Sequence, residues 1–247
     1  REIFRNGGIA ILNALTNCLR FGDVTFIDPE RYSLIEVKGG RARTQRDFRQ
    51  QREKARIEEY LSQDHVCGLF GLDLELRRKE LHYEEIYHHA ELNNLIADAN
   101  TIGTSCKKIE EGLFYLVETA HSLETQLHQA VSQCAEPPLV YFLNTLKKVS
   151  CGWYPFTLSI RDPKNLYRFY VGDLLISVIV DLSVIRRFFE KERISVQFFD
   201  QNGMTAMHLV SQDPNHHLAL QIGEHFFGRV MAEFLSLNWF LHEVLAK

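Results

Sequence analysis

Residues 24–38 constrain the fold of this chain most, because two β-prone runs flank a proline-containing turn. The first run is VTFI (residues 24–27), the turn is DPER (28–31), and the second run is YSLIEVK (32–38). β-Branched and aromatic residues on both sides of such a turn are typical of a hairpin. The pair Gly39-Gly40 follows and ends the second strand. We therefore predict an antiparallel hairpin here.

The pairing register of this hairpin follows from the turn. Whether the loop has two residues or four, Ile27 pairs with Tyr32, and counting back places Asp23 opposite Glu36. The intervening pairs are Phe26 with Ser33, Thr25 with Leu34 and Val24 with Ile35. Opposed side chains share a face with Cβ atoms about 4.5–5.5 Å apart. Two carboxylates at that separation repel each other unless a positive charge lies between them.

A divalent cation would satisfy this pair of carboxylates. Mg²⁺ prefers oxygen ligands and retains several waters, so we expect Mg²⁺ or Mn²⁺ at Asp23 and Glu36. Lys38 lies one strand repeat further on the same face, where it could orient or deprotonate a metal-bound water. The alternative is the solvated face of an edge hairpin, since a Glu-x-Lys tripeptide arises by chance on the order of once in a chain of this length.

The order of Gly22-Asp23, Glu36-x-Lys38, a helix and a further strand resembles the PD-(D/E)XK nuclease superfamily. The resemblance covers roughly residues 1–71, about the α-β-β-β-α-β core of that family. It implies a small restriction-endonuclease-like core, a mixed sheet flanked by helices. It also implies that Asp23 and Glu36 bind the metal with the Val37 carbonyl and that Lys38 serves the attacking water.

Three positions complete or depart from the family pattern. Glu2, the only acid before Asp23, is the candidate for an extra acid on the preceding helix. Gly22 replaces the proline that often precedes the aspartate. The first strand of the family's three-stranded meander would come from residues 18–21 or from before residue 1.

A basic segment follows the hairpin, where residues 38–56 carry eight basic and two acidic side chains. Their net charge of +6 contrasts with −4 for the whole chain. We expect most of this segment to lie in a helix, and a helix with so many basic side chains suits contacts to phosphates. The candidate contact residues are Arg41, Arg43, Arg46, Arg49 and Arg52, with Gln50 as an additional polar contact. The alternative is a solvated helix face with i,i+4 ion pairs such as Arg49–Glu53 and Lys54–Glu58.

The rest of the chain gives a mixed α/β pattern. Helical spacing is expected at 3–15, 44–62, 83–99, 107–134, 139–148 and 216–245, and strands at 65–71, 156–160, 167–171 and 194–199, while 174–189 fits either type. We expect residues 1–75 to form the nuclease core and residues 76–247 a larger α/β accessory region for regulation, partner binding or homo-oligomerisation. Because the chain begins at Arg1 within a predicted helix, we expect it to be part of a longer polypeptide.

Composition excludes several classes of protein. Hydrophobic residues make up 45% and charged residues 24%, which is ordinary globular usage. No apolar stretch approaches the ~20 residues of a membrane span. Five scattered cysteines without a C-x-x-C motif indicate reduced thiols in a cytoplasmic protein.

Two other side-chain groups are weaker candidates. His82, His88 and His89 lie near three glutamates, but their spacing matches no zinc motif and solvated side chains are the favoured interpretation. An aromatic group around residues 153–170 could stack on unpaired bases, although a core is favoured.

These features together predict a Mg²⁺-dependent endonuclease that hydrolyses phosphodiester bonds of DNA, or of RNA, and the family resemblance implies a role in bacterial restriction or anti-phage defence. One alternative is a catalytically inactive nuclease-like module that binds nucleic acid or serves as a scaffold. Another is a helical interaction protein in which residues 1–75 form a small sheet layer.

Overall fold

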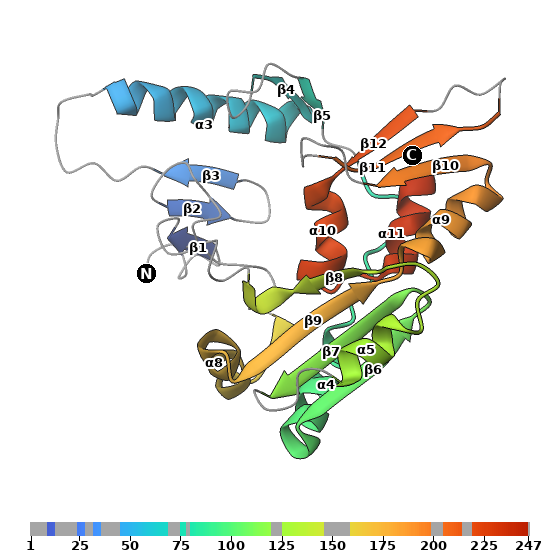
Figure 1. The fold of residues 1–247 in the computed structure, drawn as a ribbon. Coiled ribbons are helices and arrows are strands. Elements are labelled where there is room, and N and C mark those ends of the chain that lie inside the picture. Colours follow the sequence, from blue (N-terminus) through green and yellow to red (C-terminus); the bar gives the residue numbers. More distant parts are fainter. Residues whose placement is uncertain are drawn as a thin grey trace. The chain divides into compact units, whose positions relative to one another are not determined.

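The computed structural model describes residues 9–12, 24–27, 32–35, 45–68, 75–77, 80–119, 125–145, 159–198, 205–213 and 219–246. The chain is a mixed α/β protein with antiparallel sheets and flanking helices (Figure 1). It divides into two compact units, Arg1–Leu81 and His82–Lys247, which are described separately.

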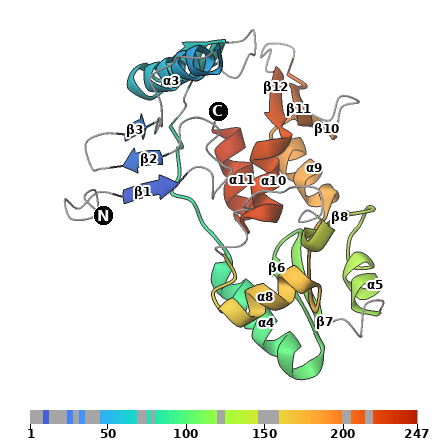
Figure 2. The same ribbon diagram turned by 90° about the vertical axis from the view of Figure 1, so that its left-hand side faces the viewer.

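The first unit contains a three-stranded antiparallel sheet. Its strands are β1 (Ile9–Leu12), β2 (Val24–Ile27) and β3 (Tyr32–Ile35), in the order β1-β2-β3. They lie side by side in both views (Figures 1 and 2). The β2–β3 pairs run from Val24 with Ile35 to Ile27 with Tyr32, so the register predicted from the turn is confirmed for these pairs.

Strand β1 corrects the prediction of a helix over 3–15. Ile9 pairs with Ile27 and Leu12 with Val24, so residues 9–12 extend the hairpin into a meander. Four consecutive apolar residues with β-branched side chains at two of them suit a strand, and the preceding glycine pair interrupts any helix. The proposed first strand at residues 18–21 lies outside the described residues.

Helix α3 (Gln45–Gln63) follows and confirms the helix predicted at 44–62. It ends at Gln63, and the next residue, Asp64, has a left-handed backbone φ of 59°. The next strand, β4 (His65–Cys67), is shorter than the predicted 65–71 and pairs in antiparallel fashion with β5 (Glu75–Arg77).

The second unit is built on a four-stranded antiparallel sheet. Its order is β6 (Thr104–Glu110), β7 (Leu113–Thr119), β9 (Leu174–Val180) and β8 (Leu139–Phe142). Side chains of β7 alternate between two buried environments. Tyr115 and its neighbours at 113 and 117 pack with α4 (His89–Ile102) in the main core. Phe114 packs instead against Ala130 of α5 (Thr125–Val131), so the two helices cover opposite faces.

Among the described residues, this unit also contains a second sheet and four more helices. The sheet contains β10 (Ile194–Phe198), β11 (Thr205–Ser211) and β12 (Ala219–Gly223), all antiparallel. The helices are α8 (Pro163–Val171), α9 (Leu182–Lys191), α10 (Glu224–Ala232) and α11 (Leu237–Leu245). Helices α10 and α11 lie side by side in both views (Figures 1 and 2).

Several element predictions for this unit were wrong. The helix predicted over 107–134 is largely the β6–β7 hairpin, because burial of β7 on both faces removes the alternation that marks a strand. The start of the helix predicted at 139–148 is strand β8. The segment predicted as a strand at 167–171 belongs to α8, which begins with an Asp162 cap and Pro163 and ends at left-handed Gly172. Helix α4 begins at His89, later than the expected residue 83.

The long helix predicted over 216–245 is divided into β12, α10 and α11. The division between the two helices falls at Phe234, whose φ is 59° and whose side chain is fully buried. Phe227, Trp239 and Phe240 are buried in the core of the same unit. The strand predicted at 194–199 is confirmed as β10, and the ambiguous segment 174–189 contains both β9 and most of α9. Among the described residues, no helix has the length and apolar character needed to cross a bilayer.

Candidate functional site

The predicted metal site lies just beyond the described part of the β2–β3 hairpin. Strand β2 begins at Val24 and strand β3 ends at Ile35, and these two residues are paired. The predicted site residues adjoin this end in sequence. They are Asp23, which precedes β2, and Glu36, Val37 and Lys38, which follow β3. All of them lie outside the described residues, as does Glu2. The pair Val24–Ile35 is therefore the last described pair before the predicted site, and the site itself stays a prediction.

Helix α3 carries the described part of the predicted nucleic-acid surface. Arg41 and Arg43 lie outside the described residues, and the side chains of Arg46, Arg49 and Gln50 do as well. The Arg52 side chain is 66% exposed and its Nε is 3.9 Å from Glu53 Oε1, a loose contact that leaves the guanidinium accessible. Lys54 forms the i,i+4 pair with Glu58 expected for a solvated face, at 3.5 Å.

Arg56, which contributes to the net basic charge of this segment, has a structural contact. Its Nη1 donates to the Gly68 carbonyl at 2.7 Å and to Glu53 Oε1 at 3.1 Å. Glu53 is itself buried, at 7% exposure. These bonds connect α3 to Gly68, the residue after β4. Arg56 therefore has a structural role, and its guanidinium is already engaged by protein acceptors.

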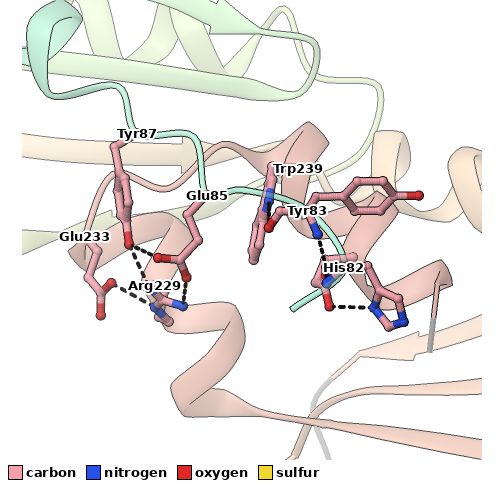
Figure 3. Close-up of polar contacts among 8 residues, drawn as sticks. His82, Tyr83, Glu85, Tyr87, Arg229, Glu233 and Trp239 are labelled. Atoms are coloured by element: carbon pink, nitrogen blue, oxygen red, sulfur yellow. Dashed lines mark hydrogen bonds and ion pairs between the residues drawn. The ribbon is translucent and has the colours of Figure 1, made fainter. Parts of the chain in front are cut away.

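In the second unit, the residues leading into α4 are held by an arginine network that sequence patterns did not predict (Figure 3). Arg229 of α10 donates to Glu85 Oε1 at 2.5 Å, to the Tyr87 hydroxyl at 2.7 Å and to Glu233 Oε2 at 2.8 Å. The Tyr87 hydroxyl donates in turn to Glu85 Oε2 at 2.6 Å. Each guanidinium nitrogen and the Tyr87 hydroxyl therefore has an acceptor, as a partly buried charged network requires.

The electrostatics of this network stabilise its charged form. The hydrogen bond from Arg229 holds the pKa of Glu85 below its usual value, although burial acts in the opposite direction. Burial and the hydrogen bond to Glu85 raise the pKa of Tyr87 to about 12. Tyr87 therefore remains protonated and Glu85 remains ionised at neutral pH, which is the pattern of a structural clamp rather than of an acid–base pair.

A second carboxylate, Glu110, caps helix α11. It accepts from the Ser236 hydroxyl at 2.9 Å and from the backbone N–H groups of Leu237 and Asn238. His88 Nε2 lies 3.5 Å from Glu110 Oε1, long for a hydrogen bond. Burial raises the pKa of Glu110, but the contacts with His88, Ser236 and Leu237 leave it below its ordinary value. An anionic residue at this helix start is favoured by the helix dipole.

The histidines near the start of this unit have protein partners. His82 contacts Glu243, His88 contacts Glu110, and His89 Nε2 lies 2.9 Å from the Glu233 carbonyl. Among the residues that the structure describes, no group of three His, Cys, Asp or Glu side chains is arranged to hold a metal ion.

The aromatic group at 153–170 is divided between core and surface. Phe169 is fully buried, which agrees with the favoured core interpretation. Tyr167 and Tyr170, on α8, are 66% and 46% exposed. Residues 153–156 lie outside the described residues.

Comparison with known proteins gives no match, since no family model, no curated protein and no solved structure is similar to this chain. The class that the fold defines is a mixed α/β protein with antiparallel sheets and flanking helices.

Proposed function

We propose that the first unit is a metal-dependent nuclease domain that hydrolyses phosphodiester bonds. The observation that carries this proposal is the register of β2 and β3, in which the last described pair is Val24 with Ile35. The same register continued by one pair would align Asp23 with Glu36. Two carboxylates aligned in this way are a suitable ligand pair for Mg²⁺ or Mn²⁺.

The order of elements also supports the proposal. Strands β1, β2 and β3 form a meander, and α3 and β4 follow, which is the β-β-β-α-β order of the PD-(D/E)XK core. Strand β1 supplies the first strand of that meander at residues 9–12. One feature differs, because β4 pairs with β5 in a two-stranded sheet of its own among the described residues.

In the proposed reaction, the ion would offset the charge that develops on the phosphate. Asp23 and Glu36 would hold it, with the Val37 carbonyl as a further oxygen ligand. The Lys38 ammonium would position the attacking water or stabilise the developing charge. Basic residues of α3, among them the exposed Arg52, would contact phosphates without reading sequence.

The decisive experiment separates chemistry from binding by means of Lys38→Ala. Single-turnover cleavage of labelled DNA and RNA is measured with Mg²⁺, and affinity is measured with Ca²⁺. Cleavage should fall about 100-fold or more while affinity stays within a few-fold, because Lys38 acts on water rather than on ground-state binding. Lys38→Arg should not restore the rate, because guanidinium is not a proton acceptor at neutral pH. Lys164→Ala, at an exposed position of α8, is the matched control.

A metal titration tests the carboxylate pair independently. Mn²⁺ should raise the midpoint of thermal unfolding of the parent protein, and Asp23→Ala should abolish that gain. Asp98→Ala, which removes an exposed carboxylate of α4, should leave it intact. Nucleic-acid binding without cleavage in any divalent ion would instead support an inactive nuclease-like binding module.

A further inference from the structure

The second unit contains a pocket of about 630 Å³, lined by one face of α9, the first turns of α11 and the turn between β6 and β7. Small-molecule sites in proteins typically have volumes of about 300–1,000 Å³, so the pocket has the size of such a site. Its lining residues are Glu110, Glu111, Val184, Arg187, Phe188, Lys191, Asn238 and Leu241.

The two cationic side chains that line this pocket have no protein partner among the described residues, whereas its two carboxylates do. Arg187 and Lys191 lie four residues apart on α9, and within the described part of the chain neither forms a hydrogen bond or ion pair. The two carboxylates are already engaged. Glu110 accepts from Ser236 and from the α11 backbone, and Glu111 is paired with Lys108. Counted with Lys108, which neutralises Glu111, the pocket carries one net positive charge, because ionised Glu110 offsets one of its two cations.

Apolar side chains line the same cavity. Val184 and Phe188 come from the face of α9 that carries the two cations, and the buried Leu241 comes from α11. The Phe188 ring lies 5.1 Å from the ring of His242 in an edge arrangement, which restricts its orientation. Val184 is held against Gly112, where a Cβ atom would approach the Val184 Cβ to 2.8 Å. The apolar surface is thus held in place by neighbouring elements.

We propose that this pocket binds a small phosphate monoester with a planar apolar body. Arg187 and Lys191 would contact the phosphate, since guanidinium and ammonium groups at one site suit a dianion. Phe188, Val184 and Leu241 would cover the apolar body. The amide of Asn238, which also lines the pocket, would offer a polar contact for orientation. This site belongs to the second unit alone and does not depend on the nuclease proposal.

The test uses 1-naphthyl phosphate as the probe and the full chain as the protein. Calorimetric titration should give binding at least tenfold tighter than for inorganic phosphate, which lacks the apolar body, or for 1-naphthol, which lacks the charge. The double variant Arg187→Gln/Lys191→Gln should weaken binding of 1-naphthyl phosphate at least tenfold. Both positions are exposed on α9, so circular dichroism should show an unchanged fold. Lys164→Gln, on α8, should bind like the parent.

Phe188→Leu provides a second, independent variant. It keeps an apolar side chain but removes the ring, so binding of 1-naphthyl phosphate should weaken while the weak binding of inorganic phosphate should not change. In a final titration AMP replaces 1-naphthyl phosphate. Weaker binding of AMP by the double variant than by the parent would support a nucleotide as the ligand. Equal binding of 1-naphthyl phosphate by the parent and the double variant, or equal affinity for inorganic phosphate and the probe, would overturn the proposal.

Discussion

The backbone N–H of His82 donates to Glu243 Oε2 at 2.8 Å, so the first residue of the second unit is fastened to its last helix across 161 positions of sequence. Glu243 also accepts from the Tyr83 N–H at 3.2 Å and lies 3.1 Å from His82 Nδ1. Its side chain is fully buried. Burial raises the pKa of Glu243, but the hydrogen bonds from His82 and Tyr83 leave it below the usual value.

Glu243→Gln should therefore destabilise the second unit by about 1–3 kcal/mol, because a buried charge-assisted acceptor is lost. Since the folded-state pKa is lowered, the stabilisation is present above the unfolded value of 4.5 and disappears as the pH falls through the folded value. The difference between parent and variant, measured by urea unfolding, should shrink in acid. Glu190→Gln, at an exposed position of α9, is the control and should be neutral. A Glu243→Gln variant as stable as the parent at neutral pH would contradict this prediction.

Glu118 should give the opposite pH dependence. This residue of β7 is 3% exposed, its Oε1 has no hydrogen-bond partner, and burial raises its pKa to about 7. Between the unfolded value of 4.5 and about 7, the folded state binds the extra proton, so stability falls as the pH rises through this window. The effect should be on the order of 1–3 kcal/mol.

Glu118→Gln removes the titrating group while keeping its size. Relative to the parent, the variant should be about equally stable at about pH 5, where folded Glu118 is neutral, and more stable at about pH 8, where the parent must bury a charge. Chemical unfolding at several pH values measures this change in slope. Parallel curves for parent and variant would show that Glu118 does not titrate in this window.

Two glycines should respond in opposite ways to alanine. Gly112, in the β6–β7 turn, has a φ of 78°, and an added Cβ would lie 2.8 Å from Val184. Gly112→Ala should destabilise the unit by about 1–3 kcal/mol. Gly228 lies inside α10, where a Cβ meets nothing within 4 Å, so Gly228→Ala should stabilise by about 0.5–1 kcal/mol. Thermal unfolding of the two variants measures both effects, and a shift in the same direction for both would refute the distinction.

The basic face of α3 should determine the salt dependence of any nucleic-acid binding. If Arg46, Arg49 and Arg52 each contact a phosphate, changing them to Gln should lower the slope of log affinity against log salt by about one unit per lost contact. Lys107→Gln, an exposed change on β6, should leave the slope unaltered. Fluorescence anisotropy at several salt concentrations provides the measurement. An unchanged slope in the triple variant would assign the arginines to a solvated helix face.

Sequence reasoning worked best where local geometry decides the structure. The β2–β3 register was predictable because a short turn fixes the pairing and each further pair follows by counting, as from Ile27 with Tyr32 to Val24 with Ile35. It was wrong at β7, where burial on both faces removes alternation, and at residues 167–171, where the Asp162 cap and Pro163 begin a helix. The candidate metal-site residues Asp23, Glu36 and Lys38 come from the sequence pattern alone, because they lie outside the described residues.

By itself, the sequence determined the β2–β3 hairpin and the helix α3, because these depend on residues close together in the chain. Only the tertiary structure decided which distant side chains meet. Arg229 contacts Glu85 across 144 positions, and no periodicity marks either residue as a partner of the other. The packing of helices and strands determines which charged side chains lie close together. Since burying an unpaired charge is costly, the stable fold is one in which such side chains are paired.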